Sequence, residues 1–202
     1  MSQRVSGYAR KDADRYETPA WVAQVLVPHL PPRVHRIWEP ACASGNMVCA
    51  LLAAGFDVIG TDLTHGDFLE RRDRATSDAI VTNPPYDQAG AFIEHALALV
   101  DVVAMLLRTD YDHAQTRQHL FGHCPYFAKK LVLTRRIVWF ERPGAAPSFN
   151  HAWFIWDAAH RGPPTIAYDA PKKINIAKRN ADAIATTCNE VAQKRASCFG
   201  NA

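Results

Sequence analysis

The chain has 202 residues, of which 48% are hydrophobic and 21% charged, as in a globular protein large enough to bury a full core. No apolar run approaches the roughly 20 residues that span a bilayer, and the polar N-terminus lacks the apolar stretch of a secretory signal, so we expect a cytoplasmic protein. The formal net charge of +3 is too small by itself to indicate a nucleic-acid partner.

Hydrophobic residues with helical spacing alternate along the chain with short apolar runs of the kind that form buried strands. The first helix is expected to begin at Pro19, with Thr18 as its N-cap, and to end before Pro31-Pro32. Gly55 is expected to close the second helix. Helices are expected over 19–30, 46–54, 88–99 and near 112–121, and strands over 36–39, 57–62, 78–82, 101–107, 130–140 and 151–157.

Strands that alternate with helices predict an α/β fold, in which helices cover both faces of a mostly parallel sheet. Residues 130–140 and 151–157 are expected to form an antiparallel pair at one edge, and any strand between residues 62 and 78 should be very short. We expect a mobile segment over 1–15, one domain over 16–165 and a polar tail over 166–202.

The tetrapeptide Asn83-Pro84-Pro85-Tyr86 follows the buried strand 78–82 and is the most informative feature of the sequence. The Asn83 side-chain oxygen and a proline carbonyl can both accept hydrogen bonds from a planar NH2 group. The prolines fix the loop and remove donors, and the Tyr86 ring offers a face for stacking a base. This pattern favours methyl transfer to an exocyclic amine, whereas the alternative is a plain proline-rich turn.

Acidic residues at two neighbouring strand ends suggest a cofactor. Glu39 ends the first strand and is followed by a turn of small residues that a ligand can approach closely. A carboxylate there repels phosphate but suits an ammonium group. Asp62 ends the second strand, where an acid commonly accepts hydrogen bonds from ribose hydroxyls. The pair therefore predicts S-adenosylmethionine, although either acid could also be a solvated strand end.

Two further groups of residues are candidates for ligand contacts. Asp67 and Phe68 could bind the cofactor's adenine, or could be an ordinary turn acid and a core ring. Between residues 108 and 142 the basic residues outnumber the acidic ones, which fits contact with phosphates and a merely solvated face equally well. No metal is expected, because the nearby histidines are not arranged as zinc ligands. The candidate substrate-binding cations are Arg108, Lys129, Lys130, Arg135 and Arg136, the last two expected within a strand.

These motifs, in this order over residues 15–157, resemble class I S-adenosylmethionine-dependent methyltransferases of the N6-adenine DNA type, especially small phage- or prophage-borne members. The resemblance implies a Rossmann-like, seven-stranded sheet with a reversed final hairpin, and a single catalytic domain over 16–165. It also implies a DNA substrate. For catalysis the resemblance implies Asn83, Pro84, Pro85 and Tyr86, and Asn150–Phe154 resembles the strand that closes the pocket. The residues implied for cofactor binding are Tyr16, Thr18, Pro19, Glu39, Pro40, Ala41, Gly45, Asp62, Asp67, Phe68 and Asn83.

The sequence departs from the family pattern at the cofactor loop and in the part that recognises the target. Ala43 stands where the family usually has a glycine, so the loop could bend differently. No separate target-recognition domain is evident, which predicts short or relaxed sequence specificity. An adenine in RNA and a glutamine amide in protein remain alternative substrates, because both offer a planar NH2. A module that binds the cofactor without catalysis is the remaining alternative. No membrane contact and no obligate protein partner are expected.

Overall fold

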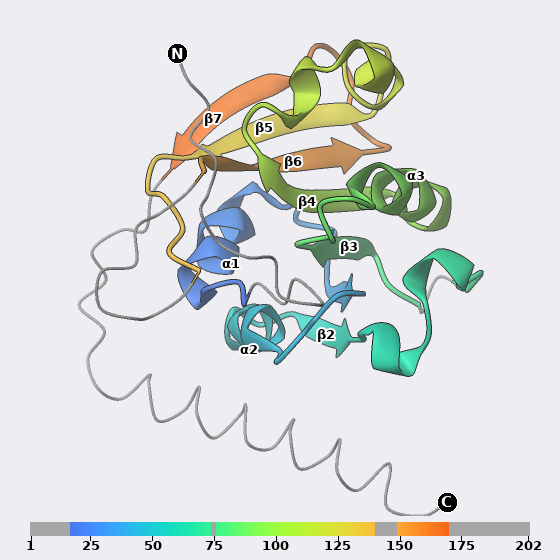
Figure 1. The fold of residues 1–202 in the computed structure, drawn as a ribbon, viewed down its shortest axis with the longest axis vertical. Coiled ribbons are helices and arrows are strands. Elements are labelled where there is room, and N and C mark those ends of the chain that lie inside the picture. Colours follow the sequence, from blue (N-terminus) through green and yellow to red (C-terminus); the bar gives the residue numbers. More distant parts are fainter. Residues whose placement is uncertain (1–16, 74–75, 140–148, 170–202) are drawn as a thin grey trace, which may run out of the picture.

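The computed structural model describes residues 17–73, 76–139 and 149–169. Its centre is a seven-stranded sheet in the order β2-β1-β3-β4-β6-β5-β7 (Figure 1). The strands are β1 (Arg36–Glu39), β2 (Asp57–Gly60), β3 (Ala79–Thr82), β4 (Val102–Arg108), β5 (Phe127–Leu133), β6 (His151–Asp157) and β7 (Thr165–Asp169). The helices are α1 (Ala20–Leu26), α2 (Asn46–Ala53) and α3 (Ala89–Leu99), with 3-10 helices η1 (Val27–His29), η2 (Leu63–His65), η3 (Phe68–Glu70), η4 (Tyr111–His113) and η5 (Gln115–Leu120).

The sheet is mixed, as the sequence predicts. β2, β1, β3 and β4 are parallel neighbours, whereas β6 runs antiparallel to both β4 and β5. The expected antiparallel pair is therefore confirmed, with β7 lying parallel to β5 on its outer side. This is the Rossmann-like arrangement that the alternation of helices and strands predicts.

Two hydrophobic cores cover the two faces of the sheet. Successive strand residues point to opposite faces, so Val81 packs with α1 and α2 while its neighbour Ile80 packs with α3. All four residues of β3 are buried, which explains why its sequence is a continuous apolar run. The carboxyl ends of β1, β2, β3 and β4 lie at one edge, and Glu39, Asp62 and the loop that begins at Asn83 lie at or just after these strand ends.

The start of α1 differs from the expectation. The helix begins at Ala20, and Pro19 occupies the N-cap position in an extended conformation without a capping side chain. The Thr18 side chain does not cap the helix because its hydroxyl lies against Asn83. The α-helix also ends earlier than expected, at Leu26, and continues as the 3-10 helix that contains Pro28, which has no backbone N–H. Gly55 closes α2 with a positive φ of 97°, as predicted.

Other boundaries also differ. The β5 strand ends at Leu133, so Arg135 and Arg136 lie beyond it and not within a strand. The expected helix near 112–121 is a pair of 3-10 helices, η4 and η5. Between β2 and β3 the described residues form η2 and η3 and contain no strand. The seventh strand is β7, which the sequence analysis did not predict and which extends the sheet past residue 165.

Some expectations fall outside the described residues. These are the mobile segment 1–15, the Tyr16 side chain, and most of the predicted tail, residues 170–202. Among the helices that are described, none combines the length and apolarity needed to cross a membrane.

Candidate active site

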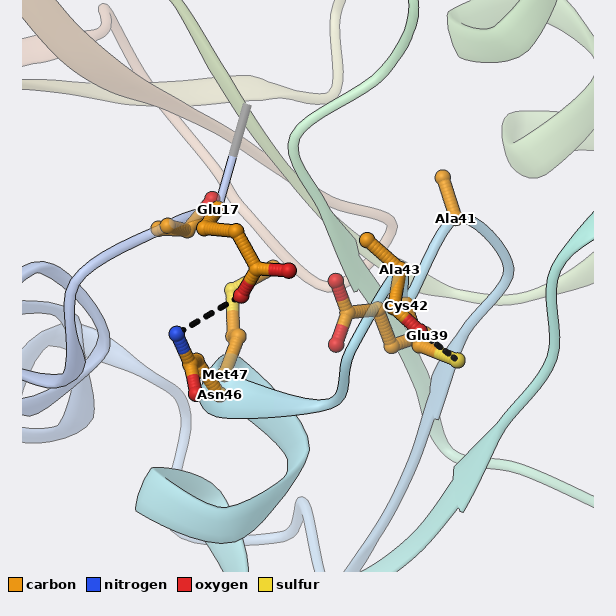
Figure 2. Close-up of a pocket in the computed structure, with 8 residues that line it drawn as sticks. Glu17, Glu39, Ala41, Cys42, Ala43, Asn46 and Met47 are labelled. Carbon is orange, nitrogen blue, oxygen red and sulfur yellow. Dashed lines mark hydrogen bonds between the residues drawn. The ribbon is translucent and has the colours of Figure 1, made fainter. Parts of the chain in front are cut away.

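A small pocket lies at the edge of the sheet where β1 ends. Its walls come from the segment before α1, the end of β1 and the start of α2, and Figure 2 shows the carboxylates of Glu17 and Glu39 facing this space. Glu39 is only 2% exposed. The full lining is Glu17, Thr18, Glu39, Ala41, Cys42, Ala43, Asn46 and Met47. Two carboxylates beside small and apolar side chains favour an ammonium-bearing ligand over a phosphate.

Glu17 ties the segment before α1 to the start of α2. Its carboxylate accepts hydrogen bonds from Ser44 Oγ and from Asn46 Nδ2, the latter at 2.8 Å (Figure 2). The sequence analysis did not assign Glu17 a role, although it stands between Tyr16 and Thr18, which the resemblance implies for cofactor binding. The acid thereby joins two walls of the pocket, since Ser44 and Asn46 lie 27 and 29 residues after Glu17 in the chain.

The loop after β1 keeps a glycine-like backbone without the expected glycine. Ala43 has a φ of 43° and Gly45 a φ of 94°, so both lie in the left-handed region. A left-handed alanine costs about 1 kcal/mol because its Cβ approaches the following carbonyl. The loop is held from the neighbouring strand by a 2.8 Å hydrogen bond from the Cys42 N–H to the Thr61 carbonyl. Ala43 therefore adopts the left-handed conformation that glycine adopts more readily, and the loop after β1 carries the resulting local strain.

Asn83 lies just beyond the end of β3. Its Nδ2 donates to Thr18 Oγ1 at 3.2 Å, which orients the amide. The side-chain oxygen Oδ1 is buried and accepts no hydrogen bond from any described residue. A buried amide oxygen without a donor is costly unless a ligand supplies one. The Pro85 carbonyl already accepts from the Gln88 N–H at 3.1 Å.

Tyr86 lies in the turn between Asn83 and α3, and 36% of the residue is exposed. Its hydroxyl is 3.2 Å from Nε2 of His151, the first residue of β6. His151 is 2% exposed, and burial lowers its pKa from 6.5 to about 4. The imidazole is therefore neutral at physiological pH. The sequence analysis had placed His151 in the closing strand without giving its side chain a role.

Asp62 and the pair Asp67-Phe68 are engaged in local structure. Asp62 Oδ1 accepts from the Leu63 N–H at 2.6 Å and caps η2, while Asp67 Oδ1 accepts from the Leu69 N–H at 2.9 Å and caps η3. Phe68 is 4% exposed and packs against Trp38 with ring centroids 5.2 Å apart. These three residues do not line the pocket, so their contacts with ribose or adenine stay predictions.

The predicted substrate-binding cations are not equivalent. Lys130 donates to both oxygens of Asp112 at 2.7 and 2.9 Å, and Arg108 pairs with Asp110 at 2.8 Å. By contrast, Arg136 donates to the neutral Asn150 at 3.0 Å. The other two cations are Lys129, half-buried in β5, and Arg135, whose guanidinium lies 5.3 Å from the centre of the Trp21 ring.

Known proteins resemble this chain in structure. No protein-family model and no curated protein matches it. A proposed RNA methyltransferase from Pyrococcus horikoshii aligns with a TM-score of 0.56 at 14% identity, over 76% of this chain and 93% of that one. A proposed class I S-adenosylmethionine-dependent methyltransferase from Listeria monocytogenes gives 0.54 at 14% identity, over 87% and 72%. A modification subunit of a proposed type I restriction enzyme from Vibrio vulnificus gives 0.51 at 16% identity, over 83% of this chain and 49% of that one.

The chain has the class I methyltransferase fold. The Listeria neighbour is described as S-adenosylmethionine-dependent, and the lining of the pocket offers groups that would suit the amino-acid end of that molecule. The ammonium group would face Glu17 and Glu39, and Met47 and the alanines offer apolar contacts for the methionine chain. A buried carboxylate such as Glu39 gains from a charged donor, which an ammonium group supplies.

Proposed function

We propose that the protein transfers a methyl group from S-adenosylmethionine to the exocyclic N6 amine of adenine in DNA, with short or relaxed sequence specificity. The observation that carries this proposal is the Asn83 amide. Thr18 holds its nitrogen, and its buried oxygen accepts no hydrogen bond from the described residues. The oxygen is thus an acceptor set for a donor that arrives with the substrate, and it lies at the same sheet edge as the cofactor pocket.

The chemistry follows from this acceptor. The adenine amine is a poor nucleophile because its lone pair is delocalised into the ring. Hydrogen bonds from the NH2 group to Asn83 Oδ1 and to the Pro84 carbonyl would favour a pyramidal nitrogen and offset the positive charge that develops on it. The Pro84 carbonyl is assigned as the second acceptor because the Pro85 carbonyl is already engaged by Gln88.

S-adenosylmethionine, when bound, supplies a methyl group on a positively charged sulfur. Asn83 Oδ1 and the Pro84 carbonyl would hold the amine while its nitrogen receives the methyl group and then releases one proton to water. Asn83 is neutral and acts as an acceptor and positioning group throughout, so the residues contribute placement and electrostatics. An adenine in a duplex must leave the stack to reach Asn83, and the exposed ring of Tyr86 offers it a stacking surface.

Nucleic acid is favoured as the substrate by the cations near this edge. Arg136, three residues after the end of β5, donates to the neutral Asn150 and pairs with no carboxylate among the described residues, so its charge would suit a phosphate. The Vibrio neighbour is described as a restriction-enzyme modification subunit, which agrees with DNA, whereas the Pyrococcus neighbour is described as an RNA methyltransferase. RNA adenine is therefore the second candidate substrate, and the same acceptors would also suit a glutamine amide.

Substitution of Asn83 by alanine tests the assigned role. Asn83→Ala should lower the transfer rate at least a hundredfold, as loss of one donor or acceptor to a transition state does, and leave cofactor affinity within about threefold. Methyl transfer to unmethylated DNA and calorimetric titration with S-adenosylmethionine measure the two quantities. Gln118→Ala, which removes an exposed amide on η5, is the matched control and should change neither. An Asn83→Ala protein that is folded but loses cofactor binding and transfer in parallel would contradict the role.

A further inference from the structure

The contact between Tyr86 and His151 has a defined direction. Nδ1 of His151 lies 3.2 Å from the Phe149 carbonyl, which can only accept a hydrogen bond. In a neutral imidazole the proton is then on Nδ1, and Nε2 has a lone pair and no proton. The Tyr86 hydroxyl, 3.2 Å from Nε2, must therefore be the donor. The backbone carbonyl of residue 149 thus sets which way the tyrosine hydroxyl bonds.

His151 is itself fixed in position. As the first residue of β6 it pairs with Arg108 at the end of β4, so its backbone belongs to the sheet. The edge-to-face contact with Trp139, with ring centroids 5.2 Å apart, supports the imidazole from the side. Burial to 2% exposure leaves the ring little freedom. The acceptor is therefore held by the sheet, whereas Tyr86 belongs to a turn.

The imidazole does not stack on the tyrosine ring. The centroids of the Tyr86 and His151 rings are 6.4 Å apart and the ring planes are inclined by 36°, so the imidazole meets the hydroxyl end of Tyr86 and is not stacked on its ring. Tyr86 as a residue remains 36% exposed. The hydrogen bond of the hydroxyl fixes the plane of the Tyr86 ring. A base that stacks on this ring then loses less binding free energy to the ordering of the side chain.

We propose that His151 is a positioning residue, which accepts the Tyr86 hydroxyl hydrogen bond and thereby fixes the Tyr86 ring for stacking of the target base. The stacking part of this inference rests on the proposed function. The contact itself does not, because it is a property of the protein alone. Sequence spacing would not reveal it, since the two residues are 65 positions apart.

The test combines two matched substitutions of His151 with removal of the tyrosine hydroxyl. An asparagine amide can replace Nδ1–H toward the Phe149 carbonyl but does not reach Tyr86, whereas a glutamine amide can place its oxygen near the position of Nε2. His151→Asn and Tyr86→Phe should each lower kcat/KM about five- to tenfold, mainly through KM for the nucleic acid. His151→Gln should retain more activity than His151→Asn.

The double variant decides whether the two residues act together. When Tyr86 is already phenylalanine, His151→Asn should cost less than twofold more, because the shared hydrogen bond is already absent. Melting temperatures of all variants separate a loss of folding from a loss of positioning. Fully additive effects in folded proteins, or an unchanged KM in His151→Asn, would overturn the inference.

A spectroscopic measurement tests the contact independently of activity. In the full chain labelled with 15N-histidine, the His151 resonances are identified by their loss in His151→Asn, and they should show a neutral ring protonated on Nδ1. Tyr86→Phe should shift the Nε2 resonance, and an unchanged resonance would overturn the contact. If Tyr86→Phe shifts the Nε2 resonance but the wild-type protein methylates no nucleic acid, the hydrogen bond is confirmed, whereas the proposed function and the stacking role are wrong.

Discussion

At the scale of single residues, the sequence indicates which side chains matter but not how they are held. The Asn83-Pro84-Pro85-Tyr86 motif predicts a loop of acceptors after a buried strand, and the structure places Asn83 and Tyr86 at that edge. The partners that orient them could not be predicted, because Thr18 and His151 each lie 65 residues away in the chain. For Phe68 the sequence does not indicate the role of the side chain, because an aromatic residue after an acid fits a ligand contact and a core position equally well. In the structure this side chain is buried.

Ala43 offers a test of strain in the cofactor loop. Ala43→Gly should raise the free energy of unfolding by about 0.5–1 kcal/mol, because relief of the left-handed alanine exceeds the added entropy of the unfolded chain. Urea denaturation measures the change. Ala91→Gly, at an exposed position inside α3, should instead lower stability by about 1 kcal/mol. Equal losses in the two variants would mean that the positive φ of Ala43 carries no strain.

At the scale of elements, hydrophobic patterns predict buried strands well and exposed ones poorly. The fully buried β3 and the largely buried β4 appear close to their expected positions. β7 was missed because it lies at the sheet edge with Ile166 63% and Tyr168 70% exposed, which leaves no alternation between apolar and polar residues. The predicted extension of β5 was wrong because Ile137, although 0% exposed, packs into the core from outside the strand.

The link between the segment before α1 and the start of α2 gives a prediction for cofactor binding. Glu17→Ala removes the acceptor for Ser44 and Asn46 and one of the two carboxylates that face the pocket. The affinity for S-adenosylmethionine should fall about tenfold, the effect of one charge-assisted hydrogen bond, as calorimetric titration would measure. Glu94→Ala is the matched control, because it removes an exposed acid paired with His119 on another part of the fold. Equal affinities in the two variants would exclude Glu17 from the binding site.

At the scale of the whole molecule, the alternation of helices and strands predicts the fold class, since the apolar central strands of a mostly parallel sheet are buried when helices cover both of its faces. The sequence could not predict which basic side chains are paired with carboxylates. A count of basic residues treats Lys130 and Arg136 alike, whereas the fold pairs Lys130 with the Asp112 carboxylate and, within the described residues, gives Arg136 the neutral Asn150 as its hydrogen-bond partner. Among the described residues, fewer of the candidate cations are therefore free of a carboxylate partner than the sequence suggests.

The central claim, that this fold methylates adenine in DNA, is tested most directly by identifying the methylated nucleoside. The protein is incubated with methyl-labelled S-adenosylmethionine and, in parallel, with unmethylated duplex DNA, single-stranded DNA or bulk RNA, and each product is digested and analysed by mass spectrometry. We predict labelled N6-methyladenine from DNA. Label confined to RNA would move the substrate while leaving the chemistry intact. No label in any nucleic acid, with the cofactor bound, would contradict the account.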